Sequence, residues 1–321
     1  MSQVPPIAAS NGNRSFVDSK AIMSLRSLEL RARVVVEGFW SGLHRSPYHG
    51  FSVEFTEYRQ YVPGDDPRYL DWRVYGRSDR YYIKKFEDET NLRCHLIVDQ
   101  SRSMTFRSIG HSKAEYATTL AATLAYFLHR QGDAIGLLAF DDRVRDYLPA
   151  RHRASHLRQL LLALERPASG KTTDLISPLR HLAEIVHKRG LMVLISDFLA
   201  PIDALDRSLA ALVAGGHEVV VFQVLDPAEV DFGFERESVF EDLETGQTLF
   251  IDPAVARRDY VPRFEAHNEE LRRRCQTHGV AVHRLLSSEP LDYALLAFLQ
   301  ERARQGRQVR HRTASGGFVS A

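Results

Sequence analysis

From residue 92 onward, short apolar runs alternate with longer segments whose apolar residues recur every three or four positions. The runs LMVLI (191–195) and EVVVFQV (218–224) are almost continuously apolar, which indicates strands buried on both faces of a sheet. The segments between such runs have the spacing of amphipathic helices. This alternation predicts an α/β fold, doubly wound around a mainly parallel sheet.

The pattern places each element approximately. Core strands are predicted at residues 94–98, 134–140, 192–195, 219–224 and 280–286, and a short antiparallel edge strand at 144–148. Helices are predicted at residues 113–129, 155–164, 175–187, 203–214, 254–277 and 291–304. Strands and helices that alternate in this way place helices on both faces of one sheet.

Ahead of residue 92 the pattern is different. Residues 1–17 are rich in Pro, Ser, Asn and Gly, which predicts a flexible tail. Apolar positions between residues 19 and 39 share one face and predict a helix, whose end is marked by Gly38 and Gly42. The stretch that follows begins with the alternating FSVEF (51–55) and contains the turn signal PGDDP, so a small β-rich unit is expected.

These patterns divide the chain into four parts. We expect a flexible tail at 1–17, a helix with the β-rich unit at 18–91, the α/β domain at 92–304 and a second tail at 305–321. The C-terminal stretch is first basic and then rich in Gly and Ser, which favours a solvated tail over a binding arm.

Overall charge limits the partners that we expect, and cysteine content limits the compartment. The chain has 42 Lys and Arg against 41 Asp and Glu, so its overall charge implies no strong attraction to nucleic acid or anionic lipid. Its two cysteines, Cys94 and Cys275, lie far apart and lack metal-ligand spacing. They are expected to be buried thiols in a reducing compartment.

No stretch of the sequence suggests a membrane or an export signal. The N-terminus lacks a continuous apolar segment, and the longest uncharged, largely apolar run, at 117–128, is too short to span a bilayer. We therefore expect a soluble cytoplasmic protein without a membrane span.

The stretch SGKTT (169–173) has the ending of a phosphate-binding P-loop. A P-loop also needs an upstream Gly, at the position that Glu165 holds, directly after a buried strand. The residues before Glu165 instead have leucines at helical spacing. A P-loop is therefore not expected, and the stretch needs another explanation.

Polar residues follow two predicted strands and the loop between them. In IVDQSRSM the first strand leads into Asp99, Ser101 and Ser103, and in SDF the strand near 192–195 leads into Asp197. The SGKTT loop adds Thr172 or Thr173. Ligands of open α/β sheets bind beyond the carboxyl ends of the strands, where these side chains are expected to meet.

These oxygen groups suit a small hard cation. Two carboxylates and three hydroxyls, without sulfur or imidazole, match the preference of Mg²⁺ for oxygen ligands, with Mn²⁺ as an alternative. The set does not fully neutralise or surround the metal. It leaves room for a carboxylate from another molecule, so a site bridged by a partner is predicted.

Simpler interpretations exist for each residue. A strand-end Asp or Ser is common in turns and caps, and Thr173 would serve as the N-cap of the next helix. An enzymatic alternative, a metal-dependent hydrolase or phosphatase, would use the same metal to polarise a phosphate or activate water. A phosphatase of the haloacid dehalogenase type would carry a second Asp where Ser101 stands, and no base adjoins the serines in sequence. A third alternative keeps the fold and leaves the site empty.

The order of these residues resembles the metal-ion-dependent adhesion site of von Willebrand factor A-type (vWA) domains. The D-x-S-x-S motif corresponds to Asp99, Ser101 and Ser103, and the later strand-end carboxylate to Asp197. The stretch GDAIGLLAFDD (132–142) is also similar to the second-strand region of such domains. Aligning Thr-Asp-Leu with the family's loop makes Thr173 the ligand, with Thr172 as the weaker candidate.

The block before the α/β domain resembles one particular bacterial family. GFSVEFTEYRQYVPGDDPRYLDWRVYGRSDRYYIKKFEDET (50–90) resembles the signature of the bacterial domain-of-unknown-function family 58, and FEDLETGQTLFID (240–252) resembles its acidic hairpin. The resemblance covers about residues 40–303. It implies a non-catalytic protein-binding module that acts beside a MoxR-type AAA+ ATPase in chaperone-like remodelling or activation of target proteins. The ATPase or a client would supply the carboxylate.

Overall fold

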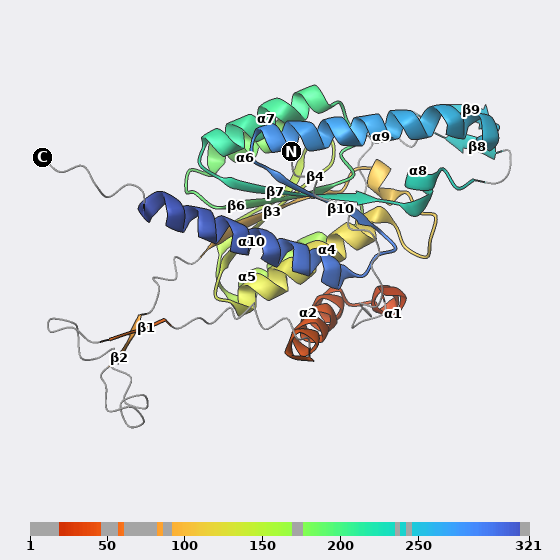
Figure 1. Ribbon diagram of the computed structural model, residues 1–321. Coiled ribbons are helices and arrows are strands. Elements are labelled where there is room, and N and C mark those ends of the chain that lie inside the picture. The colour runs from red at the N-terminus through yellow and green to blue at the C-terminus, as the bar shows by residue number, and fades with distance from the viewer. Residues whose placement is uncertain are drawn as a thin grey trace, which may run out of the picture.

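A six-stranded sheet forms the centre of the molecule, in the order β10-β7-β6-β3-β4-β5 (Figure 1). The computed structural model describes residues 19–45, 57–60, 82–85, 92–168, 176–234, 238–241 and 246–314. The strands of this sheet are β3 (Arg93–Asp99), β4 (Ala134–Phe140), β5 (Val144–Arg151), β6 (Leu191–Ser196), β7 (Glu218–Leu225) and β10 (Ala281–Leu286). All adjacent pairs are parallel except β4 and β5. The predicted mainly parallel sheet with an antiparallel edge is therefore confirmed.

The first strand of the sheet lies in its interior. Val98 of β3 pairs with Ala139 of β4 on one side and with Ile195 of β6 on the other. The chain therefore builds the sheet outward in both directions from β3. Such a reversal opens a crevice at the carboxyl ends of the central strands, where ligands of α/β proteins bind.

Helices cover both faces of the sheet, as Figure 1 shows. They are α4 (Lys113–Arg130), α5 (Ala154–Leu164), α6 (Ile176–Ile185), α7 (Ile202–Ala214), α9 (Pro253–Thr277) and α10 (Leu291–Ala314). Buried residues of α4, α5 and α10 share one hydrophobic cluster, and those of α6, α7 and α9 share the other. Each predicted helix is present, with small shifts at its ends, and α10 extends beyond the predicted end at 304.

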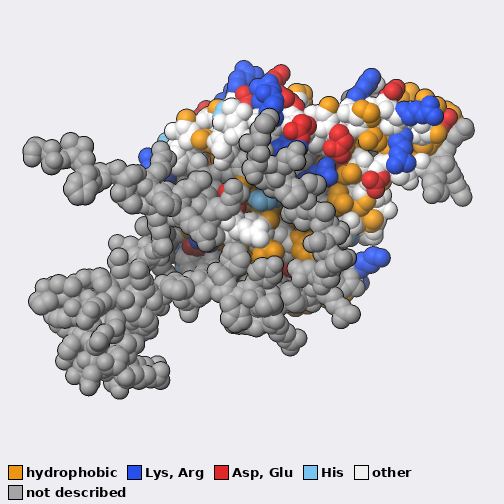
Figure 2. Space-filling view, viewed as in Figure 1, with side chains coloured by type: hydrophobic (Ala, Val, Ile, Leu, Met, Phe, Trp, Pro, Cys, Tyr) orange, Lys and Arg blue, Asp and Glu red, His pale blue; other side chains and the backbone are white. Residues whose placement is uncertain are grey.

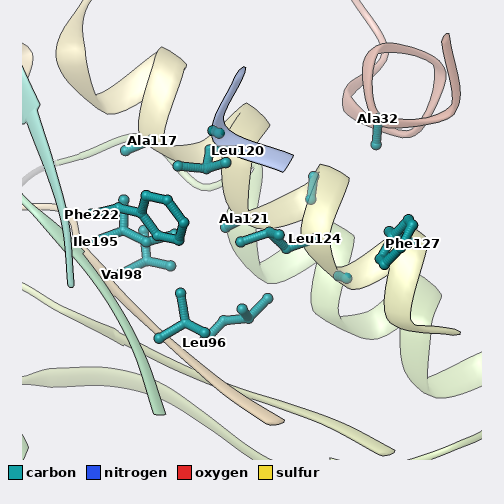
Figure 3. Close-up of a cluster of buried hydrophobic side chains, with 14 of the residues drawn as sticks. Ala32, Leu96, Val98, Ala117, Leu120, Ala121, Leu124, Phe127, Ile195 and Phe222 are labelled. Atoms are coloured by element: carbon teal, nitrogen blue, oxygen red, sulfur yellow. The ribbon is translucent and has the colours of Figure 1, made fainter. Parts of the chain in front are cut away.

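Alternate residues of β3 supply the two clusters. Leu96 and Val98 face α4, whereas Ile97 joins the cluster on the opposite face. Figure 3 shows the first cluster, with Phe222 of β7 beside the β3 residues and Leu120 of α4 opposite. A strand buried on both faces needs apolar residues at successive positions, which explains its continuous hydrophobic run.

The N-terminal region contains two helices instead of the single predicted helix. They are α1 (Ser19–Ser24) and α2 (Leu28–Arg45). Arg31 stabilises the break, because its guanidinium donates hydrogen bonds to the carbonyl oxygens of Met23 and Leu25, at 3.0 and 2.6 Å. The predicted end at Gly38 and Gly42 is wrong, since α2 continues through both glycines. Packing of α2 on α4 outweighs the low helix propensity of glycine.

Two short elements follow β7 at the carboxyl end of the sheet. Helix α8 (Pro227–Asp231) leads to an antiparallel hairpin of β8 (Ser238–Glu241) and β9 (Thr248–Ile251), which confirms the predicted hairpin. Figure 1 shows this hairpin beside the beginning of α9, and Figure 2 shows apolar side chains on the same end of the molecule. A second antiparallel pair, β1 (Glu57–Gln60) and β2 (Tyr82–Lys85), lies within the predicted β-rich unit.

Several predictions concern residues that the structure does not describe. These are the tail at 1–17, the strand at 51–55 and the SGKTT loop at 169–173. The division of the chain into four parts also remains a prediction.

Candidate metal site

The D-x-S-x-S residues form a tight turn at the end of β3. Asp99 is the last residue of that strand and is fully buried. Its Oδ1 accepts a hydrogen bond from the backbone N–H of Ser101 at 2.8 Å, which folds the chain back toward the carboxylate. A short 3₁₀ helix, η2 (Ser103–Thr105), follows. The turn brings the Oγ atoms of Ser101 and Ser103 to 3.1 Å from each other.

The neighbouring strand β6 adds the second carboxylate. Asp197 directly follows β6, and its Oδ2 accepts a hydrogen bond from Ser103 Oγ at 3.0 Å. Ser196 Oγ donates to Asp99 Oδ2 at 2.6 Å and ties the two strand ends together. Four of the predicted ligands, Asp99, Ser101, Ser103 and Asp197, thus lie in one hydrogen-bonded network. Thr173, and its alternative Thr172, lie outside the described residues.

The backbone after Asp197 has an unusual conformation. Phe198 has a φ of 54°, in the left-handed region, although it is buried and bulky. Its carbonyl oxygen accepts a 2.8 Å hydrogen bond from His267 of α9, and Gln223 of β7 donates to the carbonyl of Asp197 at 3.1 Å. Such strain persists only where surrounding contacts fix it, and it concentrates at functional sites. Here the contacts hold the strand-end turn that presents the Asp197 carboxylate.

The two carboxylates have opposite pKa shifts. Burial, followed by the charge of Asp197, raises the pKa of Asp99 to about 7. Burial also opposes ionisation of Asp197, but the charge of Lys113 and its hydrogen bond outweigh burial and lower the pKa of Asp197. Two carboxylates placed together in a dry site repel each other. A bound cation would favour the ionised form of both.

Lys113 was not expected from the sequence. It is the first residue of α4, is fully buried, and places Nζ 2.8 Å from Asp197 Oδ2 and 2.6 Å from Glu229 Oε1 of α8. Burial alone would lower its pKa, but the two carboxylates raise it. Its partners are 84 and 116 positions away in sequence, so no local pattern connects them. The sequence signal for it was a lysine at the start of a helix whose other buried residues are all uncharged.

The residues present fit a hard cation. Carboxylates and hydroxyls converge, with neither sulfur nor imidazole among the hydrogen-bonded partners of the four ligands. Within the described ranges, no group of three or more His, Cys, Asp or Glu side chains offers a metal site. A metal in this network would therefore depend on the serine hydroxyls and on further oxygens from water or from a partner.

The site differs from that of a hydrolase with a serine–histidine pair, and the chain near Glu165 differs from a P-loop. Neither Ser101 nor Ser103 is hydrogen-bonded to a histidine in the described part of the chain. The segment before Glu165 is helix α5 and not a buried strand, as the argument against a P-loop requires. Both cysteines, Cys94 and Cys275, are buried and free.

The strand order and the helices on both faces of the sheet define a doubly wound α/β domain with one antiparallel edge strand, and the oxygen-lined turn lies at its carboxyl edge. The chain belongs to the family described as "Protein of unknown function DUF58", whose family model matches residues 57–270. The family resemblance predicted from the sequence is therefore confirmed.

The chain is also similar to individual proteins of known sequence or structure. The chain is 31% identical over 293 residues to "Uncharacterized protein Rv1480" of Mycobacterium tuberculosis, covering 89% of this chain and 91% of that protein. The solved structure of the conserved hypothetical protein BatB from Bacteroides thetaiotaomicron is 14% identical, with a TM-score of 0.45, covering 67% of this chain and 99% of that one. The SpRpn10 VWA domain is 10% identical, with a TM-score of 0.38, covering 64% and 94%. These scores are too low to support a functional argument.

Across the described ranges, none of the helices combines the length and the apolar character needed to cross a bilayer.

Proposed function

We propose that this protein is a non-catalytic binding module whose Mg²⁺ ion, held by Asp99, Ser101, Ser103, Asp197 and Thr173, accepts a carboxylate from a partner protein. The observation that carries the proposal is the hydrogen-bonded network of the first four residues at the carboxyl edge of the sheet. Mn²⁺ has the same preference for oxygen and would substitute.

The number and charge of the ligands support a role in binding. Mg²⁺ takes six oxygens and keeps several waters when a protein supplies few carboxylates. Lys113 already neutralises part of the charge of Asp197. The site therefore leaves the cation with unsatisfied positive charge, which an acidic side chain of a partner would offset.

The partner we propose is a MoxR-type AAA+ ATPase or one of its client proteins, in the cytoplasm. Membership of the DUF58 family supports this choice through the resemblance described above. In this role the module would dock the ATPase on its target and contribute no chemical step of its own.

Direct metal binding is the first test. We expect Mg²⁺ to bind the wild-type protein and Asp99→Asn to weaken its affinity at least about tenfold, because a carboxylate charge beside the metal is lost. Thr173→Ala should also weaken binding. Isothermal titration calorimetry with Mg²⁺ and with Mn²⁺ measures both effects.

Asp133→Asn is the matched control for the loss of a buried carboxylate. Asp133 is buried but lies at the opposite edge of the sheet, directly before β4. Its replacement should leave Mg²⁺ affinity unchanged. Equal affinities of the wild-type protein and Asp99→Asn would contradict the assignment of the site.

Partner docking should be measured at constant Mg²⁺, because an AAA+ ATPase itself needs Mg²⁺ with its nucleotide and EDTA would confuse the two roles. The purified MoxR-type ATPase of the same organism is passed over immobilised wild-type protein, Asp99→Asn and Asp133→Asn. Binding to the wild-type protein and Asp133→Asn, with loss on Asp99→Asn, is the expected result. Equal binding to all three would mean that the ATPase uses another surface.

A further inference from the structure

Lys113 is held rigidly beside the candidate metal ligands. Its helix begins with a capping box, in which Ser112 Oγ accepts from the N–H of Glu115 and the Glu115 carboxylate accepts from the N–H of Ser112. The N–H of Lys113 donates to the carbonyl of Phe106 at 3.1 Å. With its backbone fixed and its side chain fully buried, Lys113 presents its ammonium at one place.

That ammonium binds the same oxygen that Ser103 binds. Asp197 Oδ2 lies 2.8 Å from Lys113 Nζ and 3.0 Å from Ser103 Oγ. The other oxygen, Oδ1, accepts the N–H of Leu199 at 3.2 Å. A cation that draws on Asp197 therefore competes with an ammonium already in contact with it.

Glu229 is the second carboxylate that forms an ion pair with Lys113. Its Oε1 lies 2.6 Å from Nζ, and its other oxygen accepts the N–H of Asp226 at 2.9 Å, so the carboxylate is held in place. Asp226 itself is occupied by hydrogen bonds from Ser108 and from the N–H of Ala228. The ion-paired charges thus form a short row, in which Lys113 lies between Asp197 and Glu229.

We propose that Lys113 sets the cation affinity of the site by competing with the metal for Asp197, and that Glu229 controls how strongly it competes. This inference rests on the proposed function only in taking the strand-end network as the cation site. Without a metal, the ammonium supplies the positive charge that the ionised Asp197 needs in a dry environment. With a metal present, the carboxylate of Glu229 keeps Lys113 paired while Asp197 turns to the metal.

The proposal predicts opposite effects for the two neighbours. Lys113→Met removes a positive charge close to the metal and should tighten Mg²⁺ binding about tenfold or more. Glu229→Gln leaves Lys113 with Asp197 alone and should weaken binding about threefold to tenfold. A lysine that served only to pack the core would not produce a gain of affinity.

The experiment measures Mg²⁺ binding to the full-length variants by isothermal titration calorimetry, and thermal unfolding with and without Mg²⁺. Lys188→Met and Glu218→Gln are the charge-matched controls, because both residues lie at the amino edge of the sheet, Lys188 three residues before β6 and Glu218 at the start of β7. Neither control should change the affinity. Lys113→Met should melt lower than the wild-type protein in EDTA and recover in Mg²⁺.

A double variant still tests the proposal if Lys113→Met alone does not fold. Lys113→Met combined with Glu229→Gln removes one charge of each sign and leaves no unpaired Glu229. It should bind Mg²⁺ more tightly than Glu229→Gln alone. Equal or weaker affinity of the double variant would overturn the proposal.

The outcomes separate this inference from the proposed function. If the wild-type protein binds Mg²⁺ and removal of Lys113 leaves the affinity equal or weaker, the inference is overturned and the binding module stands. If the wild-type protein binds no Mg²⁺ but the variants without Lys113 do, the inference stands and Mg²⁺-dependent docking of the natural protein is overturned. If none of them binds Mg²⁺, both are overturned.

Discussion

His95 illustrates how one residue in the central strand depends on its neighbours. It lies in β3 opposite Gly136 of β4, and an added Cβ at Gly136 would come within 2.7 Å of the imidazole Cδ2. Glycine is therefore required there by close approach. Burial, followed by the charges of His217 and Arg93, lowers the pKa of His95 from 6.5 to about 4. The folded protein thus keeps this imidazole neutral.

We expect His95 to make stability depend on pH. Its folded pKa lies below its unfolded value, so its contribution is complete above the unfolded pKa of 6.5 and is lost as the pH falls toward 4. Between pH 7 and pH 5 this loss is about 2 kcal/mol of unfolding free energy. Urea unfolding of the wild-type protein and His95→Gln at both pH values measures it. The variant should lose less stability than the wild-type protein, and an equal loss in both would contradict the pKa shift.

The hairpin after β7 is attached to the fold by aromatic side chains. Phe240 of β8 packs on Phe232 and Phe234, with ring centroids 5.8 and 4.8 Å apart, and Phe232 also contacts Tyr260 of α9. Val239, on the other face of β8, is 66% exposed and pairs with the equally exposed Phe250. One face of the hairpin therefore anchors it, while the other contributes little to its attachment.

Phe240→Ala should detach the hairpin while the sheet remains folded. Loss of two aromatic pairs removes about 1 to 3 kcal/mol of local stability, so amide exchange in β8 and β9 should accelerate about tenfold or more. Hydrogen-exchange mass spectrometry measures this rate. Val239→Ala is the control from the same strand and should leave it unchanged. Equal protection in both variants would mean that the aromatic contacts do not hold the hairpin.

At the scale of the whole molecule, α2 belongs to the core of the α/β domain although it lies ahead of the family signature block. Ala32 is fully buried, and Trp40 stacks on Phe127 of α4 with centroids 5.7 Å apart. Figure 3 shows Ala32 facing the outer side of α4. The helix thus covers an apolar surface that would otherwise face water.

A buried charge tests this packing. Ala32→Asp should lower the unfolding free energy by about 3 kcal/mol or more, because it places a carboxylate among the buried apolar side chains of this cluster. Leu30→Asp, on the exposed face of the same helix, should cost less than about 1 kcal/mol. Urea denaturation compares the two. Equal and small effects would show that α2 contributes little to the stability of the domain.

Much of the fold and part of the site were predictable from local patterns. Continuous apolar runs identified the core strands and three-to-four spacing identified the helices, because the order of apolar and polar residues along the chain reflects burial and periodicity. The rule that ligands lie beyond parallel strand ends predicted that Asp99, Ser101, Ser103 and Asp197 meet at one edge of the sheet. The break between α1 and α2 was missed, because it depends on Arg31 reaching back to two carbonyls.

The sequence by itself therefore determined the alternation of strands and helices, the family and the oxygen-rich strand ends. Only the tertiary structure decided which charges meet at those ends. Lys113 pairs with residues 84 and 116 positions away, in a region that excludes water. The strength of an ion pair depends on distance and burial, and both are properties of the packed molecule that no local pattern contains.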